Sequence, residues 1–325
     1  MFSAAVVGLG NIGMGYDYDE TDASQVLTHA AGFHHHPQYD LVAGIDPDFH
    51  SRKKFEKKFG KPSFISVGDL YKEMSPDVIS LGIPTSLHFA VYQELIQHSP
   101  RAILCEKPIA PTMEQGKKMH EMAQAAHCVL LVNYMRRFEP GVIELKKRIS
   151  NKELGDIFKG TLWYSKGILN NGSHFIDLLI FLFGSVKSLV LLGPGRKHLK
   201  SDPEPDLKLI FGDVEIYMLA GREECFSLKE MELMGTLGSI YYSRGGEEIV
   251  LKIIAPNELF PGYMVLEKEG MHITTDLQRY QLHVLDALYQ TLTTGASLNS
   301  DGSTALETLA VVENVLALVK EASNV

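Results

Sequence analysis

Nearly continuous apolar runs alternate with mixed polar stretches along the first third of this 325-residue chain. Five runs are typical of strands buried on both faces, and the stretches between them, such as Ser51–Gly60 and Ser86–His98, are helix-like. This alternation predicts a doubly wound parallel sheet that helices cover on both faces. The predicted strands are Ala4–Gly10, Asp40–Asp46, Asp77–Pro84, Ala102–Pro108 and Cys128–Tyr134.

The pattern changes after Tyr134. A helix-like stretch, Pro140–Asn151, leads into a series of strand-like segments that turn residues separate, with few helices between them. This arrangement predicts a large, mainly antiparallel sheet. The segments are Gly155–Gly167, Lys187–Gly193, Leu207–Gly212, Val214–Gly221, Cys225–Thr236, Gly238–Arg244 and Glu248–Ala255.

Three later segments have apolar residues at helical spacing, namely Phe175–Phe183, Ile273–Gly295 and Ser303–Ala322. The chain is long enough for two domains of ordinary size. We therefore predict an α/β protein with a doubly wound, Rossmann-type domain over residues 1–133. An α+β domain follows over residues 134–325.

A glycine-rich turn follows the first predicted strand. Gly8, Gly10 and Gly13 form the pattern G-x-G-x-x-G, with Asn11 and Ile12 inside it. Glycines let the backbone approach a pyrophosphate, whose charge is met by N–H groups at a helix start. Directly after the first strand of a parallel series, this motif predicts a dinucleotide-binding site.

Asp46 ends the second predicted strand, where an acid is expected to accept the adenosine ribose hydroxyls. A 2′-phosphate would meet the negative charges of Asp46 and Asp48 there, and no arginine is directly adjacent in the sequence. NAD(H) is therefore favoured over NADP(H). Asp46 follows Gly13 by 33 residues, against about 20 in the usual pattern.

The surplus residues are best placed in an insertion, Met14–Ser24, which carries four acids. Acids folded over a pyrophosphate would repel it, so the insertion is predicted to lean away from the phosphates. It forms either a surface loop or a rim of the active-site cleft. A new helix is predicted to begin at Asp22, with Gln25 in the capping pattern, and to end near His35.

Composition narrows the classes of function. The chain is 45% hydrophobic and 22% charged, with a formal net charge of −9 and short basic clusters, so no nucleic-acid partner is predicted. No uninterrupted apolar run approaches the ~18 residues that span a bilayer, so no membrane partner is predicted. Three cysteines lack metal-type spacing and favour a reduced, cytoplasmic compartment. Consecutive histidines at 34–36 point in different directions, and no metal site is predicted.

Three motifs occur in a characteristic order: GLGNIG at residues 8–13, CEKPIA at 105–110 and NNGSHFIDLL at 170–179. With them, essentially the whole chain resembles the Gfo/Idh/MocA oxidoreductase family, which includes glucose–fructose oxidoreductase and inositol dehydrogenase. The resemblance implies a bound nicotinamide cofactor, a sugar-like or cyclic polyol substrate, and a homodimer or homotetramer formed through the sheet of the second domain.

The resemblance also implies roles for individual residues. Lys107 would lie at the nicotinamide and the substrate, with His174 facing it, while Glu106 and the Ile83–Pro84 turn line the nicotinamide half of the cofactor. Oxidising a secondary alcohol sends a hydride to the nicotinamide and a proton to a base that titrates near the working pH. Histidine can be this base while lysine polarises the oxygen, or the roles can be reversed.

Asn170 departs from the family pattern, which has an aspartate four residues before the histidine. On a helix the two side chains would share a face, and an amide cannot stabilise an imidazolium by its charge. A lower pKa is therefore expected for His174 than an aspartate at position 170 would give. Asn171 and Ser173 are predicted to be turn and N-cap residues. Weaker candidates for substrate contact are Arg136, Tyr164 and Lys166.

The predicted activity is hydride transfer between NAD(H) and a secondary alcohol or ketone of a sugar, sugar nucleotide or cyclic polyol. A cofactor-binding regulator without turnover is the alternative, which the departure at Asn170 keeps open. The presence of both Lys107 and His174 favours the enzyme. A minor third possibility is glycosidic cleavage assisted by bound NAD.

Overall fold

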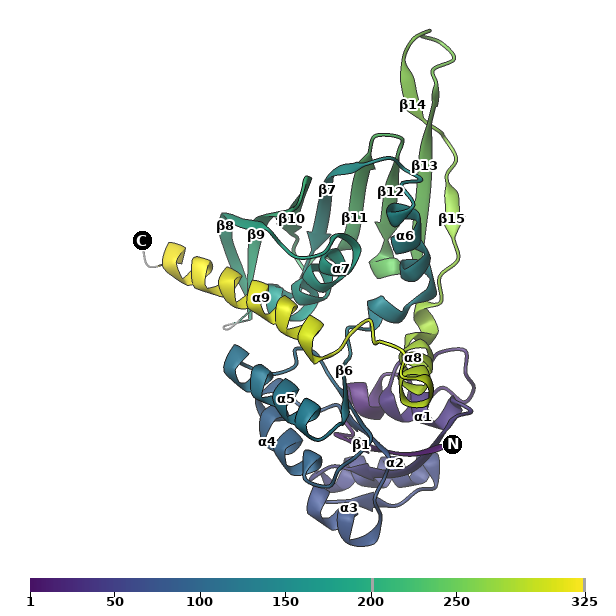
Figure 1. Cartoon of the computed structure of the whole chain (residues 1–325), viewed down its shortest axis with the longest axis vertical. Helices are drawn as coiled ribbons and strands as arrows, with labels where there is room; N and C mark the ends of the chain where they lie inside the picture. Colours follow the sequence, from purple (N-terminus) through teal and green to yellow (C-terminus); the bar gives the residue numbers. More distant parts are fainter. Residues whose placement is uncertain (200–201, 324–325) are drawn as a thin grey trace. The chain divides into compact units, whose positions relative to one another are not determined.

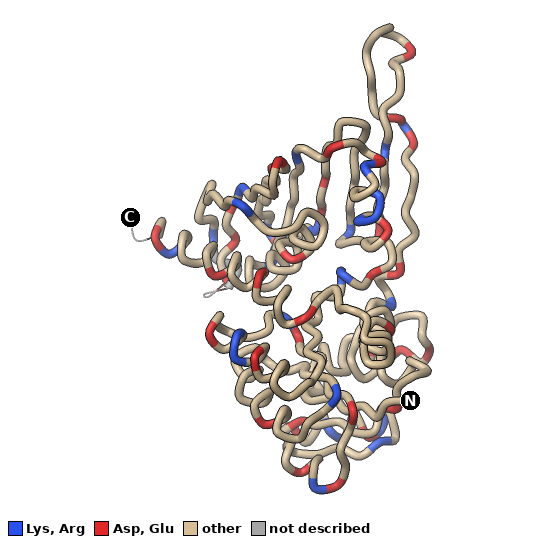
Figure 2. The backbone as a smooth tube through the Cα atoms, in the orientation of Figure 1, with Lys and Arg blue, Asp and Glu red and all other residues tan. Residues whose placement is uncertain are grey.

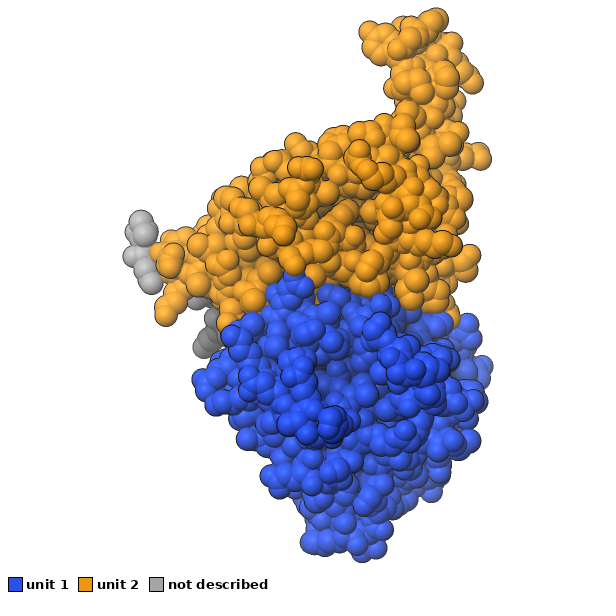
Figure 3. All heavy atoms as spheres, in the orientation of Figure 1, with its two compact units in different colours: residues 1–138, 278–309 blue, residues 139–277, 310–325 orange. Residues whose placement is uncertain are grey.

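The computed structural model describes residues 1–199 and 202–323. The chain forms two compact units (Figure 3). Unit 1 comprises Met1–Phe138 and Gln278–Leu309, and unit 2 comprises Glu139–Leu277 and Ala310–Val325. The sequence suggested a single division between residues 133 and 134, whereas a segment near the C-terminus returns to unit 1.

Unit 1 is built on a six-stranded parallel sheet in the order β3-β2-β1-β4-β5-β6. The five predicted strands are confirmed. The sixth strand, β3, was not predicted because it is only two residues long. The strands are β1 (Phe2–Val7), β2 (Tyr39–Ile45), β3 (Ser63–Phe64), β4 (Val78–Leu81), β5 (Ala102–Cys105) and β6 (Val129–Val132).

Helices cover both faces of this sheet, because successive side chains of a strand point to opposite sides. Ala4 and Val6 of β1 pack in a core shared with α1 (His29–His35), α2 (Phe49–Phe59) and α8 (Tyr280–Thr294). Their neighbours Ala5 and Val7 pack in the opposite core, with helices α3 (Val67–Glu73), α4 (Thr85–Ile96) and α5 (Met113–Ala125). This doubly wound arrangement is the predicted one.

The helix after the glycine turn begins later than predicted. One wide turn, η1 (Asn11–Gly15), follows the glycines, and α1 begins only at His29. Its N-cap is Thr28, whose hydroxyl accepts a hydrogen bond from the backbone N–H of Ala31. Asp22 instead accepts from the N–H of Ser24 in a local turn, so the helix start predicted there is wrong. The end at His35 is confirmed.

The insertion is anchored on unit 1 through Asp17, which is 2% exposed. Its carboxylate accepts hydrogen bonds from the N–H groups of Leu27 and Thr28, at 2.7 and 2.9 Å. Lys58 of α2 donates to the carbonyl oxygens of Asp17 and Tyr18. These hydrogen bonds attach the insertion to α1 and α2. The insertion is therefore not an extension of the first helix.

Unit 2 contains a nine-stranded sheet in the order β14-β13-β12-β11-β7-β10-β9-β8, with β15 paired to β13. Among the described strands of unit 2, only β7 and β10 pair in parallel, so the predicted mainly antiparallel sheet is confirmed. Strands β14 and β15 are additions, and β13 and β14 form a long projecting hairpin (Figure 1). The strands are β7 (Ile157–Tyr164), β8 (Ser188–Leu199), β9 (Asp202–Phe211), β10 (Val214–Ala220), β11 (Lys229–Gly235), β12 (Gly238–Ser243), β13 (Glu248–Pro256), β14 (Met264–Leu266) and β15 (Met271–Ile273).

One face of this sheet packs on α6 (Pro140–Ser150), α7 (Ser173–Phe183) and the C-terminal part of α9 (Gly302–Ser323). Along β7 the side chains alternate, so Leu162 is buried in this core while Trp163 is 43% exposed on the opposite face. Lys and Arg are interspersed with Asp and Glu along the chain of both units (Figure 2). Helix α7 is the core helix that the sequence predicts over Phe175–Phe183.

Helix α9 is the one helix in the described part of the chain that is long and apolar enough to cross a membrane, judged by length and composition alone. The sequence-based expectation differed because the charged side chains of α9 interrupt its apolar residues. Ala305 and Leu309 of α9 pack in a core of unit 1, and Val312 and Val315 in that of unit 2. The apolar stripe of α9 therefore contributes to the two protein cores.

Candidate functional site

The glycine turn leaves room for a phosphate beside its backbone. Gly8 has φ +91°, and a Cβ there would lie 2.5 Å from the carbonyl oxygen of Gly82. A Cβ on Gly13 would lie 1.9 Å from the carbonyl oxygen of Gly8. By contrast, a Cβ on Gly10 would meet no atom within 4 Å. Gly8 and Gly13 thus permit the turn, because a side chain at either position would clash with the backbone. Gly10 leaves the outer surface of the turn open, which a pyrophosphate needs in order to approach the backbone.

A cavity of about 520 Å³ opens at the carboxyl ends of β1, β2 and β4. Its volume lies in the range of small-molecule sites, and it lies where doubly wound sheets bind ligands. Its lining includes five of the residues assigned to the cofactor from the sequence: Gly8, Gly10, Asp46, Ile83 and Pro84. The cavity thus brings these five predicted residues together in unit 1.

Asp46 is held in place by the backbone around it. One carboxylate oxygen accepts a hydrogen bond from the N–H of Leu9 in the glycine turn, and the other accepts from the N–H of Asp48, both at 2.8 Å. The guanidinium of Arg52, on α2, donates to the carbonyl oxygens of Asp46 and Pro47 at 2.8 and 3.0 Å. The sequence therefore missed a cation near Asp46, because α2 folds Arg52 back over the turn.

Glu106 follows β5 and stands in a closed ring of polar side chains within unit 1. Its Oε1 accepts a hydrogen bond of 2.6 Å from Nδ2 of Asn133 and lies 3.2 Å from Nε2 of His29. Nδ2 of Asn133 also donates to Oε1 of Gln281 at 3.3 Å. Nε2 of Gln281 lies 3.1 Å from Nδ1 of His29 and closes the ring. Lys107 is the next residue after Glu106 and is half-buried.

The ring keeps Glu106 charged. Burial alone would raise the pKa of this carboxyl, but His29, the hydrogen bond from Asn133 and the charge of Lys107 outweigh burial. Together they hold the pKa of Glu106 below its ordinary value. None of His29, Asn133 and Gln281 was singled out from the sequence.

His88 of α4 joins the two loops that carry the remaining candidates of unit 1. Its Nε2 lies 2.9 Å from the carbonyl oxygen of Ile83, and its Nδ1 lies 3.1 and 3.2 Å from those of Pro108 and Ile109. Burial lowers the pKa of His88. This imidazole therefore lies between the Ile83–Pro84 turn and the loop that begins with Lys107, and in its neutral form it donates to one of them.

The second set of candidates lies in unit 2, where a wide turn, η3 (Gly167–Gly172), runs into α7. Asn170 lies in η3 and His174 in the first turn of α7, both half-buried, so their spacing is not that of one regular α-helix. Ser173 is wrong as an N-cap, because its hydroxyl donates to the carbonyl oxygens of Leu169 and Asn170 and Gly172 occupies the cap position.

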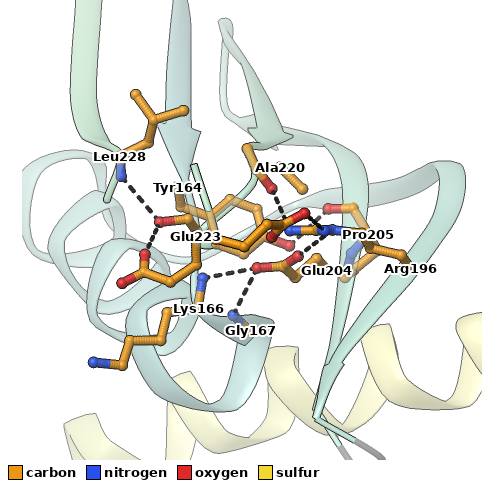
Figure 4. A network of polar contacts seen from close by, with 12 residues as sticks. Tyr164, Lys166, Gly167, Arg196, Glu204, Pro205, Ala220, Glu223 and Leu228 are labelled. Carbon is orange, nitrogen blue, oxygen red and sulfur yellow. Dashed lines mark hydrogen bonds and ion pairs between the residues drawn. The ribbon is translucent and has the colours of Figure 1, made fainter. Parts of the chain in front are cut away.

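Three acids at alternate positions of β9 hold this turn and its surroundings. Oε1 of Glu204, whose side chain is fully buried, accepts from the N–H groups of Lys166 and Gly167 at 2.7 and 3.3 Å (Figure 4). A carboxylate oxygen of Asp202 accepts from the N–H of Leu169 at 2.8 Å. Asp206 accepts from the N–H of Ala220 on β10 at 2.8 Å. The sequence analysis missed these positioning residues.

Arg196 of β8 completes this network. Its Nε donates to Glu204 at 2.9 Å, and its Nη1 pairs with Glu224 (Figure 4). Ser165 donates to Glu223 and accepts from the N–H of Leu228 (Figure 4). The segment before η3 is thus bonded on both sides, which fixes the start of the turn that carries Asn170.

Three predicted substrate residues have different surroundings. Tyr164 is fully buried and its hydroxyl donates to the carbonyl oxygen of Pro205, which makes it a core residue and not a substrate contact. Lys166 is exposed, has φ +72° and points away from the network (Figure 4). Arg136 lies in a 3-10 turn, η2 (Met135–Phe138), of unit 1 and is 6% exposed.

Comparisons with known proteins agree with this architecture. Residues 2–134 match the model of an oxidoreductase family with an NAD-binding Rossmann fold. Over these residues the chain is similar to the Gfo/Idh/MocA family of oxidoreductases. It is 27% identical over 227 residues to inositol 2-dehydrogenase 2 of Saccharopolyspora erythraea, covering 63% of this chain and 62% of that protein.

Two other proteins resemble it over different lengths. An uncharacterised oxidoreductase of Schizosaccharomyces pombe is 25% identical over 144 residues, and the match spans 39% of each chain. The fold of the WlbA dehydrogenase from Bordetella pertussis, solved with NADH and UDP-GlcNAcA, superposes with a TM-score of 0.77 at 18% identity. That superposition covers 99% of this chain and 96% of the other, and it shows the shared two-domain fold.

Proposed function

We propose that this protein is a nicotinamide-dependent dehydrogenase or reductase. It transfers a hydride between the cofactor and a secondary alcohol or ketone of a sugar, sugar nucleotide or cyclic polyol. The observation that carries the proposal is the cavity of unit 1, where the open glycine turn and the fixed carboxylate of Asp46 meet. The names of two similar proteins above, an inositol dehydrogenase and a dehydrogenase solved with a sugar nucleotide, support this class of substrate.

The nicotinamide ring would supply or accept the hydride. In this proposal Gly8, Gly10, Asn11, Ile12, Gly13 and Asp46 hold the adenosine and pyrophosphate half of the cofactor, and Ile83, Pro84 and Glu106 its nicotinamide half. Lys107 polarises the oxygen of the reacting carbon through its ammonium group, while His174 exchanges the proton of the hydroxyl. Both residue types can act as an acid or a base at neutral pH once their surroundings tune them.

The direct test is a screen of sugars, sugar nucleotides and cyclic polyols in which the absorbance of NADH is followed in both directions. Turnover of at least one of these substrates is expected. Tight binding of NADH without turnover on any of them would instead favour a regulatory protein of the same fold.

NAD(H) is proposed as the preferred cofactor, because the charge of Asp46 opposes a 2′-phosphate. Wild-type protein is expected to bind NADH at least about 10-fold more tightly than NADPH, a difference of about 1.4 kcal/mol. Asp46→Asn keeps an acceptor oxygen but removes the charge, so it should narrow that ratio. Fluorescence titration with both cofactors measures it. Equal affinities in the wild type would show that Arg52 offsets Asp46, which contradicts the proposal.

Asn170 is proposed to act with His174 on the substrate. Asn170→Asp would add a negative charge near the start of α7 and is expected to raise the pKa of His174. The limb of the kcat/KM profile that needs neutral histidine should then move to higher pH by about one unit. Asn151→Asp, at the C-terminal end of α6, is the control. An unmoved profile would leave Asn170 as a turn residue.

The open face of the nine-stranded sheet fits the proposed association of two copies. Trp163 of β7 is 43% exposed on the open face of the sheet of unit 2, and large exposed apolar side chains are favoured at protein interfaces. Sedimentation measurement of the mass in solution tests this, and a monomer at micromolar concentration would contradict it.

A further inference from the structure

The polar ring around Glu106 draws its members from four separate parts of unit 1. His29 lies on α1, Glu106 follows β5, Asn133 follows β6 and Gln281 lies on α8. His29 and Gln281 are 0% exposed and Asn133 is 3% exposed. Polar side chains buried this deeply are kept only where their hydrogen bonds are arranged consistently.

The contacts of the Asn133 and Gln281 amides fix the direction of their hydrogen bonds, whereas Nε2 of His29 and Oδ1 of Asn133 meet no acceptor or donor in hydrogen-bond geometry among the described residues. Because the Glu106 carboxylate can only accept, Nδ2 of Asn133 donates to it and also donates to Oε1 of Gln281. The other end of the Gln281 amide is therefore its NH₂ group, which donates to Nδ1 of His29. Nδ1 thus carries a lone pair and no proton.

A neutral imidazole has one N–H, and here it must be on Nε2. That nitrogen lies 3.2 Å from Oε1 of Glu106. A proton on Nδ1 would instead bring two N–H donors together in a fully buried place, which is costly. The orientation of a single amide on α8 therefore decides which nitrogen of His29 faces Glu106.

We propose that His29 and Gln281 are positioning residues for Glu106. Gln281 holds His29 in its neutral Nε2–H tautomer, and His29 with Asn133 then fixes the Glu106 carboxylate beside Lys107. The role of this pair in turnover rests on the proposed function, whereas the tautomer of His29 does not.

Other charged or titratable groups lie around the ring, among them His88 and Cys105, on whose pKa values the charge of Glu106 acts. Lys107 follows Glu106, and Asp17 of the insertion binds the N–H of Thr28, next to His29. Tyr280 of α8 donates to the carbonyl oxygen of Leu27, and its pKa is raised by burial first and by Glu106 and Asp17 next. Arg136 of η2 also lies near, since its charge acts on Tyr280 in the opposite direction. A charge introduced at position 281 would therefore act chiefly on His29.

The test places a carboxylate where the Gln281 amide donates. Gln281→Glu replaces the donor facing Nδ1 with an acceptor, so His29 is expected to become an imidazolium that donates from both nitrogens. Long-range proton–nitrogen NMR of ¹⁵N-histidine-labelled protein reads this state directly, with the His29 signal assigned from a His29→Gln variant. In its neutral form, wild-type His29 should carry its proton on Nε2.

Kinetics show whether the pair positions the site. Gln281→Glu and Gln281→Met should each lower kcat about 10-fold, because a slight displacement of a group in the site has an effect of this size. The affinity of each variant for NADH should stay within about twofold of the wild-type value. His29→Gln keeps an N–H donor for Glu106 and should restore most of the kcat that His29→Leu loses. Gln290→Glu, the same change at an exposed position of α8, is the matched control and should leave kcat and the NMR spectrum unchanged.

The outcomes separate the two proposals. A wild-type His29 with its proton on Nδ1, or a Gln281→Glu protein with unchanged His29 signals, overturns the tautomer assignment. If the NMR spectra show the assigned tautomers but kcat is unchanged in every variant, the positioning role is overturned. A protein that turns over no substrate defeats the proposed function instead, and the NMR result stands apart from it.

Discussion

Replacing Lys107 with methionine is expected to lower kcat about 1,000-fold while NADH still binds. Methionine retains an apolar stem of similar length but has no ammonium group to polarise the reacting oxygen or hold a proton. Positioned acid–base groups contribute about 10²- to 10⁴-fold to a rate. Steady-state rates on the substrate found by the screen, with fluorescence titration of NADH, measure both quantities. The loss should fall on kcat because the group acts chiefly in the transition state.

Lys118→Met is the matched control for this change. Lys118 lies on α5, is exposed and pairs with Glu114 at 2.7 Å, so its loss should leave turnover within about twofold. Undiminished turnover in Lys107→Met would remove Lys107 from the proposed chemistry. An equal loss in both variants would point to a general effect of lysine replacement.

Replacing Glu204 with leucine is expected to cost unit 2 about 3 kcal/mol of unfolding free energy. The change leaves the N–H groups of Lys166 and Gly167 without their acceptor, and each such group costs about 1–3 kcal/mol when it stays buried. Glu204→Gln keeps an acceptor oxygen and should lose much less. The midpoint of urea unfolding, followed by the fluorescence of Trp163, the single tryptophan, measures the difference.

Glu224→Leu removes the exposed carboxylate that shares Arg196 with Glu204. This control should shift the midpoint only slightly, because exposed ion pairs contribute little. If Glu224→Leu and Glu204→Leu were equally destabilising, the loss would come from the arginine and not from the backbone of the turn. A drop in kcat in Glu204→Leu protein that remains folded would link the turn to Asn170 and His174.

The parallel sheet could be predicted because its strands are buried on both faces and therefore have nearly unbroken apolar sequences. The glycine turn and Asp46 follow from local pattern as well. The helix start at Asp22 failed for a physical reason. The side chain of Asp22 accepts a hydrogen bond from a nearby N–H in a local turn. The true helix start, at the N-cap Thr28, lies six residues later, beside the N–H group that the buried carboxylate of Asp17 binds. A capping pattern records only local bonds and cannot reveal that competition.

The supports of the candidate site were hidden because they lie far apart in the sequence. Gln281 is 252 residues from His29, and Glu204 is 38 residues from the N–H of Lys166. One signal was available at β9, where Asp202, Glu204 and Asp206 alternate in an otherwise strand-like segment. Acids at every second position of a strand share one face. On a face that is buried in the core, they are expected to bind something within the protein.

The return of residues 278–309 to unit 1 has a consequence for how the protein is made. Val284, Leu285 and Leu288 of α8 complete the core around Phe33, and Leu309 completes the opposite core beside Met119. During synthesis from the N-terminus, the six strands of unit 1 are finished long before these residues leave the ribosome. Val312 and Val315, which follow in α9, belong to the core of unit 2. Both units therefore reach their final packing only after α9 has been translated.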